Sequence, residues 1–330
     1  QMSEQSSPSY DVIVIGSGLG GLTVASLAAQ LRHKRVLVLE RHFKAGGFTH
    51  SYRRKNHSWD VGLHYVGRMH RGASERALLD FVTDRKLRWK KTPEPYEKVI
   101  FPDFSFDVLG DPARFKADLV ARFPSEDAAI ERYLGDVKRA TRWMLLHGIA
   151  GGTHPVGRAA IRAAGRLSRK LALASTSAYL DERFTDDRLK ALLTAQWGNH
   201  GLPPSRSIFG VHAALVAHYL RGTHYPVGGA SKIAEHAAAV IESRGGKCLA
   251  SQDVKRILVE RKRAVGVEAE HKTRGTTQYL APAVISDAGA YNTYAHLLPD
   301  EHGAKRAEIL RELVEQGSSM VVVYLGLNKD

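Results

Sequence analysis

The sequence predicts an α/β fold that opens with a strand, a helix and a second strand, and three observations predict it. A fully apolar run, Val12 to Ile15, leads directly into three glycines at the spacing Gly-x-Gly-x-x-Gly. A helix rich in small residues follows. A second apolar run, Val36 to Leu39, then ends on an acidic residue. A glycine motif alone is weak evidence, but here all the parts of one βαβ unit occur in order.

The glycines and the acid have separate roles in binding an adenosine diphosphate group. Gly16 allows the tight turn, Gly18 lets the backbone approach a pyrophosphate, and Gly21 lets the helix pack closely on the strand. Gly20 adds a further position without a side chain. The unpaired N–H groups at the helix start favour a phosphate anion. Glu40 is placed to accept hydrogen bonds from the ribose hydroxyls, which disfavours the 2′-phosphate of NADP.

Length and composition are those of a globular protein with two domains. The 330 residues exceed one ordinary core, and 43% hydrophobic and 25% charged residues are usual for such proteins. No run approaches the roughly 18 apolar residues of a membrane span, and the polar N-terminus lacks the apolar region of a signal peptide. The single cysteine, Cys248, excludes an internal disulfide and a C-x-x-C redox pair. We therefore expect a cytoplasmic protein.

The net charge of +14 fits nucleic acid, an anionic membrane surface or plain solubility. No nucleic-acid-binding motif accompanies the charge, so we expect no nucleic-acid partner. The basic residues are densest in a predicted helix over 158–171, where they share one side: Arg158, Arg162, Arg166, Arg169 and Lys170. This pattern indicates either a helix lying at a lipid headgroup interface or an ordinary solvated face. The sixteen histidines lack the spacing of a metal site, so we expect no metal.

Later segments extend the prediction. A diglycine, Gly46 and Gly47, indicates further backbone close to a phosphate or a flavin. Residues 112–195 read as mostly helical. Strands are predicted at 254–260, 264–270 and 278–281, followed by a buried strand within 283–290. Residues 320–327 also read as a strand.

These residues carry a resemblance to the phytoene desaturase and carotenoid isomerase superfamily of flavoproteins, and within it to retinol saturase-like oxidoreductases. The matching motifs are Y-D-V-I-V-I-G-S-G-L-G-G-L-T at 10–23, D-V-G-L-H-Y-V-G at 60–67, M-H-R-G at 69–72, H-Y-P-V-G-G at 224–229 and V-I-S-D-A-G at 284–289. The resemblance spans nearly all of 10–330.

The resemblance implies a Rossmann-like FAD-binding domain of the glutathione reductase and amine oxidase type, with an inserted α+β substrate domain. We expect residues 10–72 and 226–290 to form the discontinuous FAD-binding domain. Residues 73–225 and 291–330 would form the substrate domain. Family members usually continue to a late Gly-Asp segment that holds the ribityl chain of the flavin. This sequence ends before such a segment, so the resemblance implies that it is truncated.

The resemblance also assigns residues to the cofactor FAD. The four glycines of the first motif and Glu40 would hold its ADP part, and the diglycine would lie near the pyrophosphate or the ring. Val254 would pack at the adenine, and the small residues of the later motifs would approach the cofactor closely. The full set of expected cofactor-binding residues is Gly16, Gly18, Gly20, Gly21, Glu40, Arg41, Gly46, Gly47, Val254, Ala288 and Gly289, with Gly228 and Gly229 nearby.

Flavin chemistry on carbon–carbon bonds needs the protein to position the substrate and to supply or remove a proton. His64 and Tyr65 are the favoured proton donors, because their segment is expected to run beside the flavin. Asp60 is a third candidate, for which a structural role is at least as strong an interpretation. His224 and Tyr225 also flank a glycine-rich motif. His212, His218 and Tyr219 are expected in the core or in a pocket wall.

The leading hypothesis is an FAD-dependent oxidoreductase that saturates, desaturates or isomerises double bonds of a polyene lipid such as a retinoid, a carotenoid or an unsaturated fatty acid. One alternative is a soluble NAD-dependent dehydrogenase. Another is a non-catalytic prenyl-lipid-binding protein of the GDP-dissociation-inhibitor type. We expect a lipophilic small-molecule substrate. The sequence leaves the direction of the reaction, its electron partner and the oligomeric state open.

Overall fold

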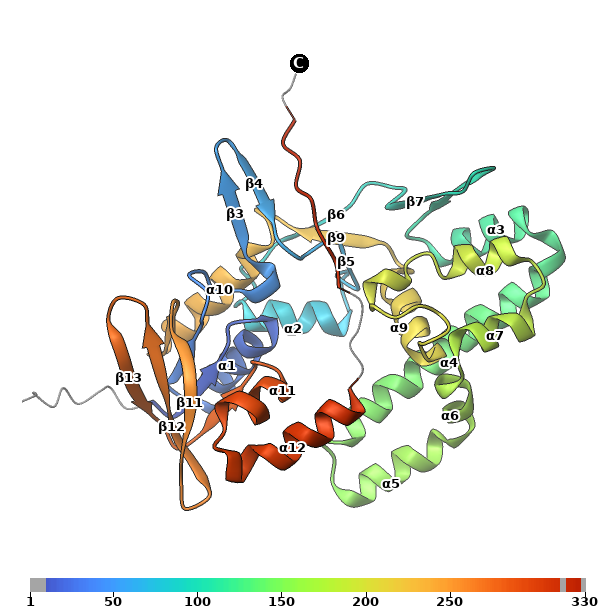
Figure 1. The fold of residues 1–330 in the computed structure, drawn as a ribbon. Coiled ribbons are helices and arrows are strands. Elements are labelled where there is room, and N and C mark those ends of the chain that lie inside the picture. The colour runs from blue at the N-terminus through green and yellow to red at the C-terminus, as the bar shows by residue number, and fades with distance from the viewer. Residues whose placement is uncertain (1–9, 315–318, 328–330) are drawn as a thin grey trace, which may run out of the picture.

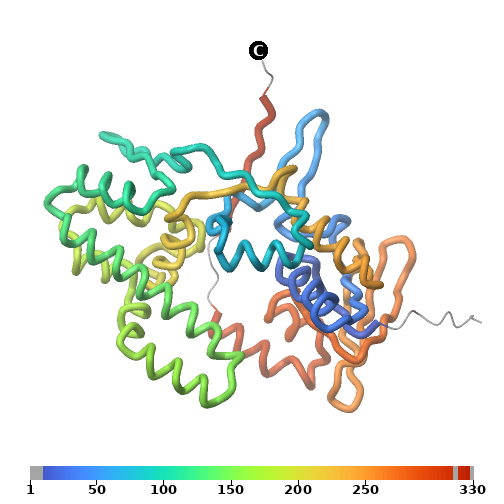
Figure 2. The backbone as a smooth tube through the Cα atoms, turned by 180° about the vertical axis from the view of Figure 1, so that it is seen from behind, coloured from blue at the N-terminus to red at the C-terminus, as the bar shows by residue number. Residues whose placement is uncertain are grey.

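The structure is a computed structural model and describes residues 10–314 and 319–327. Figures 1 and 2 show two groups of elements. A parallel sheet with its covering helices and an antiparallel sheet forms one group, and the helices from α3 to α9 form the other. The predicted fold class is confirmed: the protein is α/β, with a Rossmann-like sheet and a second region of helices and short strands.

The central sheet has four parallel strands in the order β10-β2-β1-β14. Its strands come from both ends of the described chain: β1 (Val12–Ile15), β2 (Val36–Leu39), β10 (Lys247–Leu249) and β14 (Val284–Ser286). All eight residues of β1 and β2 are buried. A strand buried on both faces needs apolar residues at every position, and this explains the uninterrupted apolar runs of the sequence.

The two faces of the sheet have different cover. Val14 and Val38 face α1 (Leu19–Arg32) and α10 (Ser231–Glu242) and share a core cluster with them. Ile15 and Leu39 pack on the other face against an antiparallel meander. Its strands are β11 (Asp253–Glu260), β12 (Arg263–His271) and β13 (Gly275–Leu280). The predicted strands are therefore confirmed to within a few residues.

Short sheets connect the parallel sheet to the helices. One has the order β5-β9-β6, and two are hairpins. The elements of this part are η1 (Gly47–Thr49), β3 (Ser51–Arg54), β4 (His57–Asp60), β5 (Val66–Gly67), α2 (Ser74–Val82), β6 (Trp89–Lys91), β7 (Glu97–Ile100), β8 (Ser105–Val108) and β9 (Thr223–Pro226). Strand β9 pairs with both β5 and β6, and so it brings residues 223–226 beside the segment that follows β4.

The helical group confirms the predicted helical stretch. Its elements are α3 (Pro112–Arg122), η2 (Pro124–Glu126), α4 (Asp127–Ala150), α5 (Pro155–Ala164), α6 (Arg166–Leu173), α7 (Thr176–Arg183), α8 (Asp187–Leu193), η3 (Trp197–Asn199) and α9 (Phe209–Tyr219). Helix α4 is its centre, because Ile130, Tyr133 and Val137 point into one large apolar core with α8 and α9.

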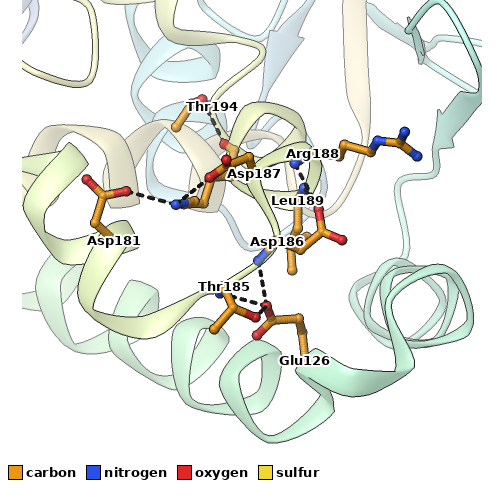
Figure 3. Close-up of polar contacts among 9 residues, drawn as sticks. Glu126, Asp181, Thr185, Asp186, Asp187, Arg188, Leu189 and Thr194 are labelled. Carbon is orange, nitrogen blue, oxygen red and sulfur yellow. Dashed lines mark hydrogen bonds and ion pairs between the residues drawn. The ribbon is translucent and has the colours of Figure 1, made fainter.

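The buried carboxylate of Glu126 joins two parts of the helical group through hydrogen bonds (Figure 3). Oε1 of Glu126 accepts hydrogen bonds from both the backbone N–H and the side-chain hydroxyl of Thr185, each at 2.7 Å. It also accepts from the N–H of Asp186 at 2.8 Å. Asp186 in turn caps α8 by accepting from the backbone N–H of Arg188 and Leu189. The start of α4 is thus joined to the turn between α7 and α8.

The predicted single basic helix over 158–171 is wrong. Gly165 ends α5 and begins α6. A Cβ on Gly165 would lie 2.9 Å from the Trp143 ring, so the break allows a close approach to α4. Arg158 does not share the outer face, because its guanidinium donates to the carbonyls of Ala150, Gly151 and Thr153. The remaining basic residues lie on two short helices.

The predicted strand at 320–327 is also wrong. These residues form no strand ladder, and most of the side chains are exposed. Tyr324 donates a hydrogen bond to the carbonyl of Val61 and packs edge-on against Tyr52. Before them come α11 (Ala290–Asn292), the π-helical η4 (Thr293–Leu297) and α12 (Asp300–Leu313). Within 10–314 and 319–327, no helix has the length and apolar character needed to cross a bilayer.

Candidate functional site

A cavity of about 970 Å³ opens at the carboxyl ends of the parallel strands. Its wall includes the ends of β1 and β2, the start of β11 and the residues that follow β14. Ligands of open α/β sheets bind at this edge, and the volume suits a cofactor. Residues 46–49, Asn292 and His296 also line it. Segments far apart in the sequence therefore meet around one space.

The glycine loop has the backbone geometry that its sequence predicts. Gly16 has a φ of +94°, which side chains other than glycine rarely adopt, and its N–H donates to the Leu39 carbonyl at 2.8 Å. A Cβ on Gly21 would lie 2.2 Å from the carbonyl oxygen of Gly16. This backbone contact sets the close packing of α1 on β1. Gly18 is the residue before the first turn of α1, and it lines the cavity.

Hydrogen bonds within the chain hold the Glu40 carboxylate in place. Its Oε2 accepts from the backbone N–H of Ser17 at 2.8 Å and from the Ser17 hydroxyl at 2.6 Å. Its Oε1 accepts from the N–H of His42 at 2.8 Å. The Ser17 hydroxyl also accepts from the N–H of Gly46 at 3.0 Å. Ser17 thus ties together the glycine loop, the acid after β2 and the diglycine.

The diglycine continues the cavity wall. Gly46 and Gly47 have φ values of +121° and +53°. A Cβ on Gly47 would lie 3.0 Å from the Cα of Gly18, so the two glycine segments touch through their backbones. The side chain of Phe48, which follows, is 81% exposed and lines the same cavity. The space is therefore enclosed by backbone on one side and has an aromatic residue at its rim.

The structure brings most of the expected cofactor-binding residues to this cavity. Those that line it are Gly16, Gly18, Glu40, Arg41, Gly46, Gly47, Val254 and Ala288. Gly20, Gly21 and Gly289 are not in its wall, although Gly20 and Gly21 belong to the first turn of α1. Gly228 and Gly229 lie elsewhere, and a Cβ on Gly229 would contact the Asp60 carboxylate at 3.4 Å. Ligand binding by all of these residues stays a prediction.

Sequence reasoning missed several residues in the wall or directly behind it. Asp287 belongs to the V-I-S-D-A-G motif, but only its neighbours Ala288 and Gly289 were singled out. Its Oδ2 accepts from the N–H of Gly21 at 2.8 Å. Ser17 occupies a variable position of the glycine motif, where the pattern itself carries no signal. Lys255 follows Val254 into the wall and pairs with Asp253 at 2.6 Å.

The Asp60 carboxylate accepts hydrogen bonds from a distant part of the chain, as a residue with a structural role would. Its Oδ2 accepts from the Tyr225 hydroxyl at 2.5 Å and from the N–H of Ala230 at 3.0 Å. Tyr225 also donates to the Leu63 carbonyl at 3.1 Å. Burial and the bond to Asp60 raise the pKa of Tyr225. Asp60 therefore joins the end of β4 to the start of α10, and a catalytic role for it stays an untested prediction.

His64 and Tyr65 do not line the 970 Å³ cavity, although the preceding Leu63 does. The Tyr65 hydroxyl donates to Glu97, and Gln196 donates to the same carboxylate oxygen at 3.2 Å. Burial and this carboxylate raise the pKa of Tyr65, so its proton stays on the phenol at neutral pH. The exposed ring of His64 packs edge-on against Tyr65. The Tyr65 ring also packs edge-on against Tyr219 of α9, so Tyr65 contacts the helical group.

A second, small cavity of about 40 Å³ lies within the helical group. Tyr96, Gln196 and Tyr219 line it together with aliphatic side chains. Burial raises the pKa of Tyr219 to about 12. Tyr219 is thus in a pocket wall, as predicted, and this cavity is separate from the glycine loop.

His212 is in the core, as predicted. It is 2% exposed, and its Nε2 lies 2.8 Å from the Tyr133 hydroxyl. Burial lowers the pKa of His212 to about 4. His218 is partly buried, and its Nε2 accepts from the N–H of Gly67 at 3.0 Å. In the part of the chain that the structure describes, no three histidine, cysteine or acidic side chains gather as a metal site would need.

Comparisons with known proteins agree with this geometry. A family model described as an NAD(P)-binding Rossmann-like domain matches residues 14–82. The chain is 32% identical to an all-trans-retinol 13,14-reductase of Danio rerio over 96% of this chain and 54% of that protein. It is 25% identical to a chloroplastic prolycopene isomerase of Arabidopsis thaliana over 97% of this chain and 54% of that protein. The chain thus spans about half the length of the curated relatives it matches.

Solved structures share the fold. An oxidoreductase from Methanosarcina mazei superposes with a TM-score of 0.61 at 18% identity, covering 91% of this chain and 65% of that one. A cyclohexylamine oxidase from Brevibacterium oxydans superposes with a TM-score of 0.57 at 18% identity, covering 92% and 63%. The Rossmann-like fold of the amine oxidase type is therefore confirmed.

Proposed function

The chain belongs to the retinol saturase-like carotenoid oxidoreductase family, and from this premise we propose that it forms part of an FAD-dependent oxidoreductase acting on double bonds of a polyene lipid. The observation that carries the proposal is the cavity in which Gly18, Glu40, Gly47, Val254 and Ala288 meet. Its volume and its position at the strand ends suit a dinucleotide. The relatives' names, all-trans-retinol 13,14-reductase and prolycopene isomerase, indicate the substrate class.

The residues present fit FAD. The backbone at Gly16, Gly46 and Gly47 adopts positive φ beside the cavity, so the wall there carries no side chains. We propose that the glycine loop holds the pyrophosphate and that Glu40, oriented by Ser17, accepts hydrogen bonds from the ribose. FAD, when bound, supplies two-electron redox chemistry at carbon–carbon bonds.

His64, Tyr65 and Asp60 are the candidate sources of the proton that such chemistry needs. We propose His64 as the donor in preference to Tyr65, because the Tyr65 proton is engaged by Glu97. Replacement of His64 by Gln is expected to lower turnover strongly while FAD stays bound, and Tyr65→Phe is expected to lower it less. Turnover that is unchanged in His64→Gln would contradict the assignment.

We propose that the FAD-binding domain comprises residues 10–72 and 226–290, with 73–225 and 291–330 as the substrate domain. Pairing of β1 and β2 with β10 and β14 supports the first, discontinuous domain, because the parallel sheet takes two strands from each segment. Separate packing of the α3–α9 helices around their own core supports the 73–225 part of the second, whereas Leu297 of the 291–330 part packs in the core of the sheet region.

The visible spectrum of the purified full-length protein tests the proposal. A flavin spectrum, present at purification or after added FAD, is the expected result. A colourless protein that takes up no FAD but is protected from unfolding by NAD would instead support an NAD-dependent dehydrogenase. A protein that binds neither but retains a prenyl lipid would support a carrier. Product analysis with a retinoid, a carotenoid and a polyunsaturated fatty acid then identifies the substrate and the direction of reaction.

We also propose that helices α5 and α6 contact an anionic membrane surface. No acidic residue occurs between Asp136 and Asp181. Within the described chain, the exposed side chains of Arg162, Arg166, Arg169 and Lys170 form no ion pair. Exposed apolar side chains lie among and beside them: Leu145 and Ile149 on α4, Val156 on α5 and Leu167 on α6. Basic and apolar side chains together are typical of a surface that binds lipid headgroups.

Sedimentation with phosphatidylcholine vesicles, with and without phosphatidylserine, tests this surface. We expect binding only with phosphatidylserine, weakening with salt. Each removed charge near the membrane is worth roughly 1 kcal/mol, so Arg166→Gln should reduce partitioning about fivefold. Leu167→Ser, whose side chain is 95% exposed, should also reduce it, whereas the control Ile100→Ser, 76% exposed on β7, should not. Equal binding by all variants would contradict the proposal.

A further inference from the structure

The space above the glycine loop is occupied by a carboxylate of the chain itself. A Cβ on Gly18 would lie 2.9 Å from Oδ2 of Asp287, and one on Gly20 would lie 2.6 Å from Oδ1. The Asp287 side chain therefore fills the room that these two glycines leave open. In a dinucleotide-binding loop that room lets the backbone approach a pyrophosphate.

Asp287 also uses one of the donors on which an anion at this place depends. Its Oδ2 accepts from the N–H of Gly21, which lies in the first turn of α1. The first N–H groups of a helix have no partner within the helix, and the helix dipole favours a negative charge beside them. The residue that supplies this charge lies 266 positions further along the chain, on the loop after β14.

No cation balances Asp287 directly. Among residues 10–314 and 319–327, it makes no ion pair with a lysine or an arginine. Lys255 lines the same cavity but is paired with Asp253 and Glu270. The favourable interactions of the Asp287 carboxylate are therefore with the start of α1, where a phosphate would have the same interactions.

We propose that Asp287 is an internal substitute for the cofactor's pyrophosphate, and that binding of the ADP group displaces its carboxylate from the start of α1. The inference rests on the proposed function, because it takes the glycine loop as the pyrophosphate site. It adds a specificity-determining residue to that site: the Asp287 carboxylate lies at the helix start and opposes anionic ligands. Only a ligand with further contacts, such as Glu40 to a ribose, displaces it.

Replacement of Asp287 by Asn tests the displacement. Asparagine keeps an oxygen that can accept from Gly21 but removes the charge that opposes the pyrophosphate. Two charges a few ångströms apart interact by roughly 1 kcal/mol or more even in water, so Asp287→Asn should bind ADP and FAD about fivefold or more tightly than the unaltered protein. Titration calorimetry with ADP and fluorescence titration with FAD measure this without any assay of turnover.

The control is Asp107→Asn, because Asp107 lies on β8, outside this cavity, and is paired with Lys98. We expect its affinity for ADP to change less than about twofold. An Asp287→Asn protein that binds ADP equally or more weakly overturns the inference, since Asp287 would then hold the ligand or ignore it, while the proposed function stands. If neither the unaltered protein nor Asp287→Asn binds ADP or FAD, both the inference and the proposed function are wrong.

Discussion

The parallel-sheet region and the helical region use buried and half-buried polar groups differently. Beside the cavity, the Glu40 carboxylate accepts hydrogen bonds from the backbone N–H groups of Ser17 and His42. Glu40 also lines the cavity, so its oxygens can accept further hydrogen bonds from a ligand. In the helical region, Glu126 and the Tyr133–His212 pair bond to groups within the core. The first arrangement prepares a surface for a ligand, whereas the second joins elements to one another.

Glycines show the same contrast. Gly21 touches the carbonyl of Gly16 so closely that no side chain fits between α1 and β1. Gly135, in the middle of α4, has nothing within 4 Å of the position of its missing Cβ. A glycine in the sheet region is thus required by a contact, and this glycine in the helical region is not. The difference can be tested by placing the same methyl group at both positions.

The largest expected effect comes from Gly21→Ala. Its Cβ would lie 2.2 Å from the Gly16 carbonyl oxygen, so α1 must move away from β1. We expect a loss of more than about 2 kcal/mol in the free energy of unfolding and loss of FAD binding. The matched control Gly135→Ala should instead stabilise by about 0.5–1 kcal/mol, because alanine favours a helix interior. Urea unfolding measures both, and equal effects would remove the contrast.

The sequence predicted the sheet region better than the helical region for a physical reason. Gly16, Gly21 and Glu40 occupy positions where backbone geometry or ligand chemistry admits few residue types, so their pattern is recognisable. Gly165 weakens the prediction of one helix over 158–171, but its close contact with Trp143 at the break is not contained in the local pattern. Asp287 acts on α1 across 266 residues, a contact that no local pattern contains.

The second expected effect is a pH dependence that belongs to the helical region. Burial lowers the pKa of His212 to about 4 from an ordinary value near 6.5, so the folded protein keeps this histidine neutral while the unfolded chain takes up a proton. The stabilisation is complete above about pH 6.5 and is lost as the pH falls towards 4. The shift corresponds to up to about 3 kcal/mol.

Urea unfolding at several values of pH between 7.5 and 4.5 measures this loss. His212→Gln should be less stable at pH 7.5, because the packing against Tyr133 changes, but its stability should depend less on pH. His200, His218 and His224 also have pKa values lowered by burial, so some slope will remain. A variant with the same slope as the unaltered protein would show that His212 is not the main group that titrates.

The smallest expected effect on stability and FAD affinity concerns Ser17, which is hydrogen-bonded to Glu40 and Gly46 in the cavity wall. Ser17→Ala removes one hydrogen bond to Glu40 and the bond from Gly46, while the Ser17 N–H still donates to Glu40. A single neutral hydrogen bond contributes about 1 kcal/mol, and one to a charged group somewhat more. We therefore expect a loss of about 1–2 kcal/mol in the free energy of unfolding. We also expect FAD to bind about five- to tenfold more weakly, because Glu40 is held less firmly. A large loss of stability with unchanged affinity would assign Ser17 to the fold alone.

The most direct test of the central claim, that the sheet edge binds the ADP part of FAD, is competition between FAD and ADP on the unaltered protein and on Glu40→Ala. The account predicts one FAD per chain, displacement by ADP, and affinity for both ligands reduced at least about tenfold in Glu40→Ala, because the ribose loses its acceptor. FAD binding that ADP does not displace, or that Glu40→Ala leaves unchanged, would contradict the placement of the cofactor in this cavity.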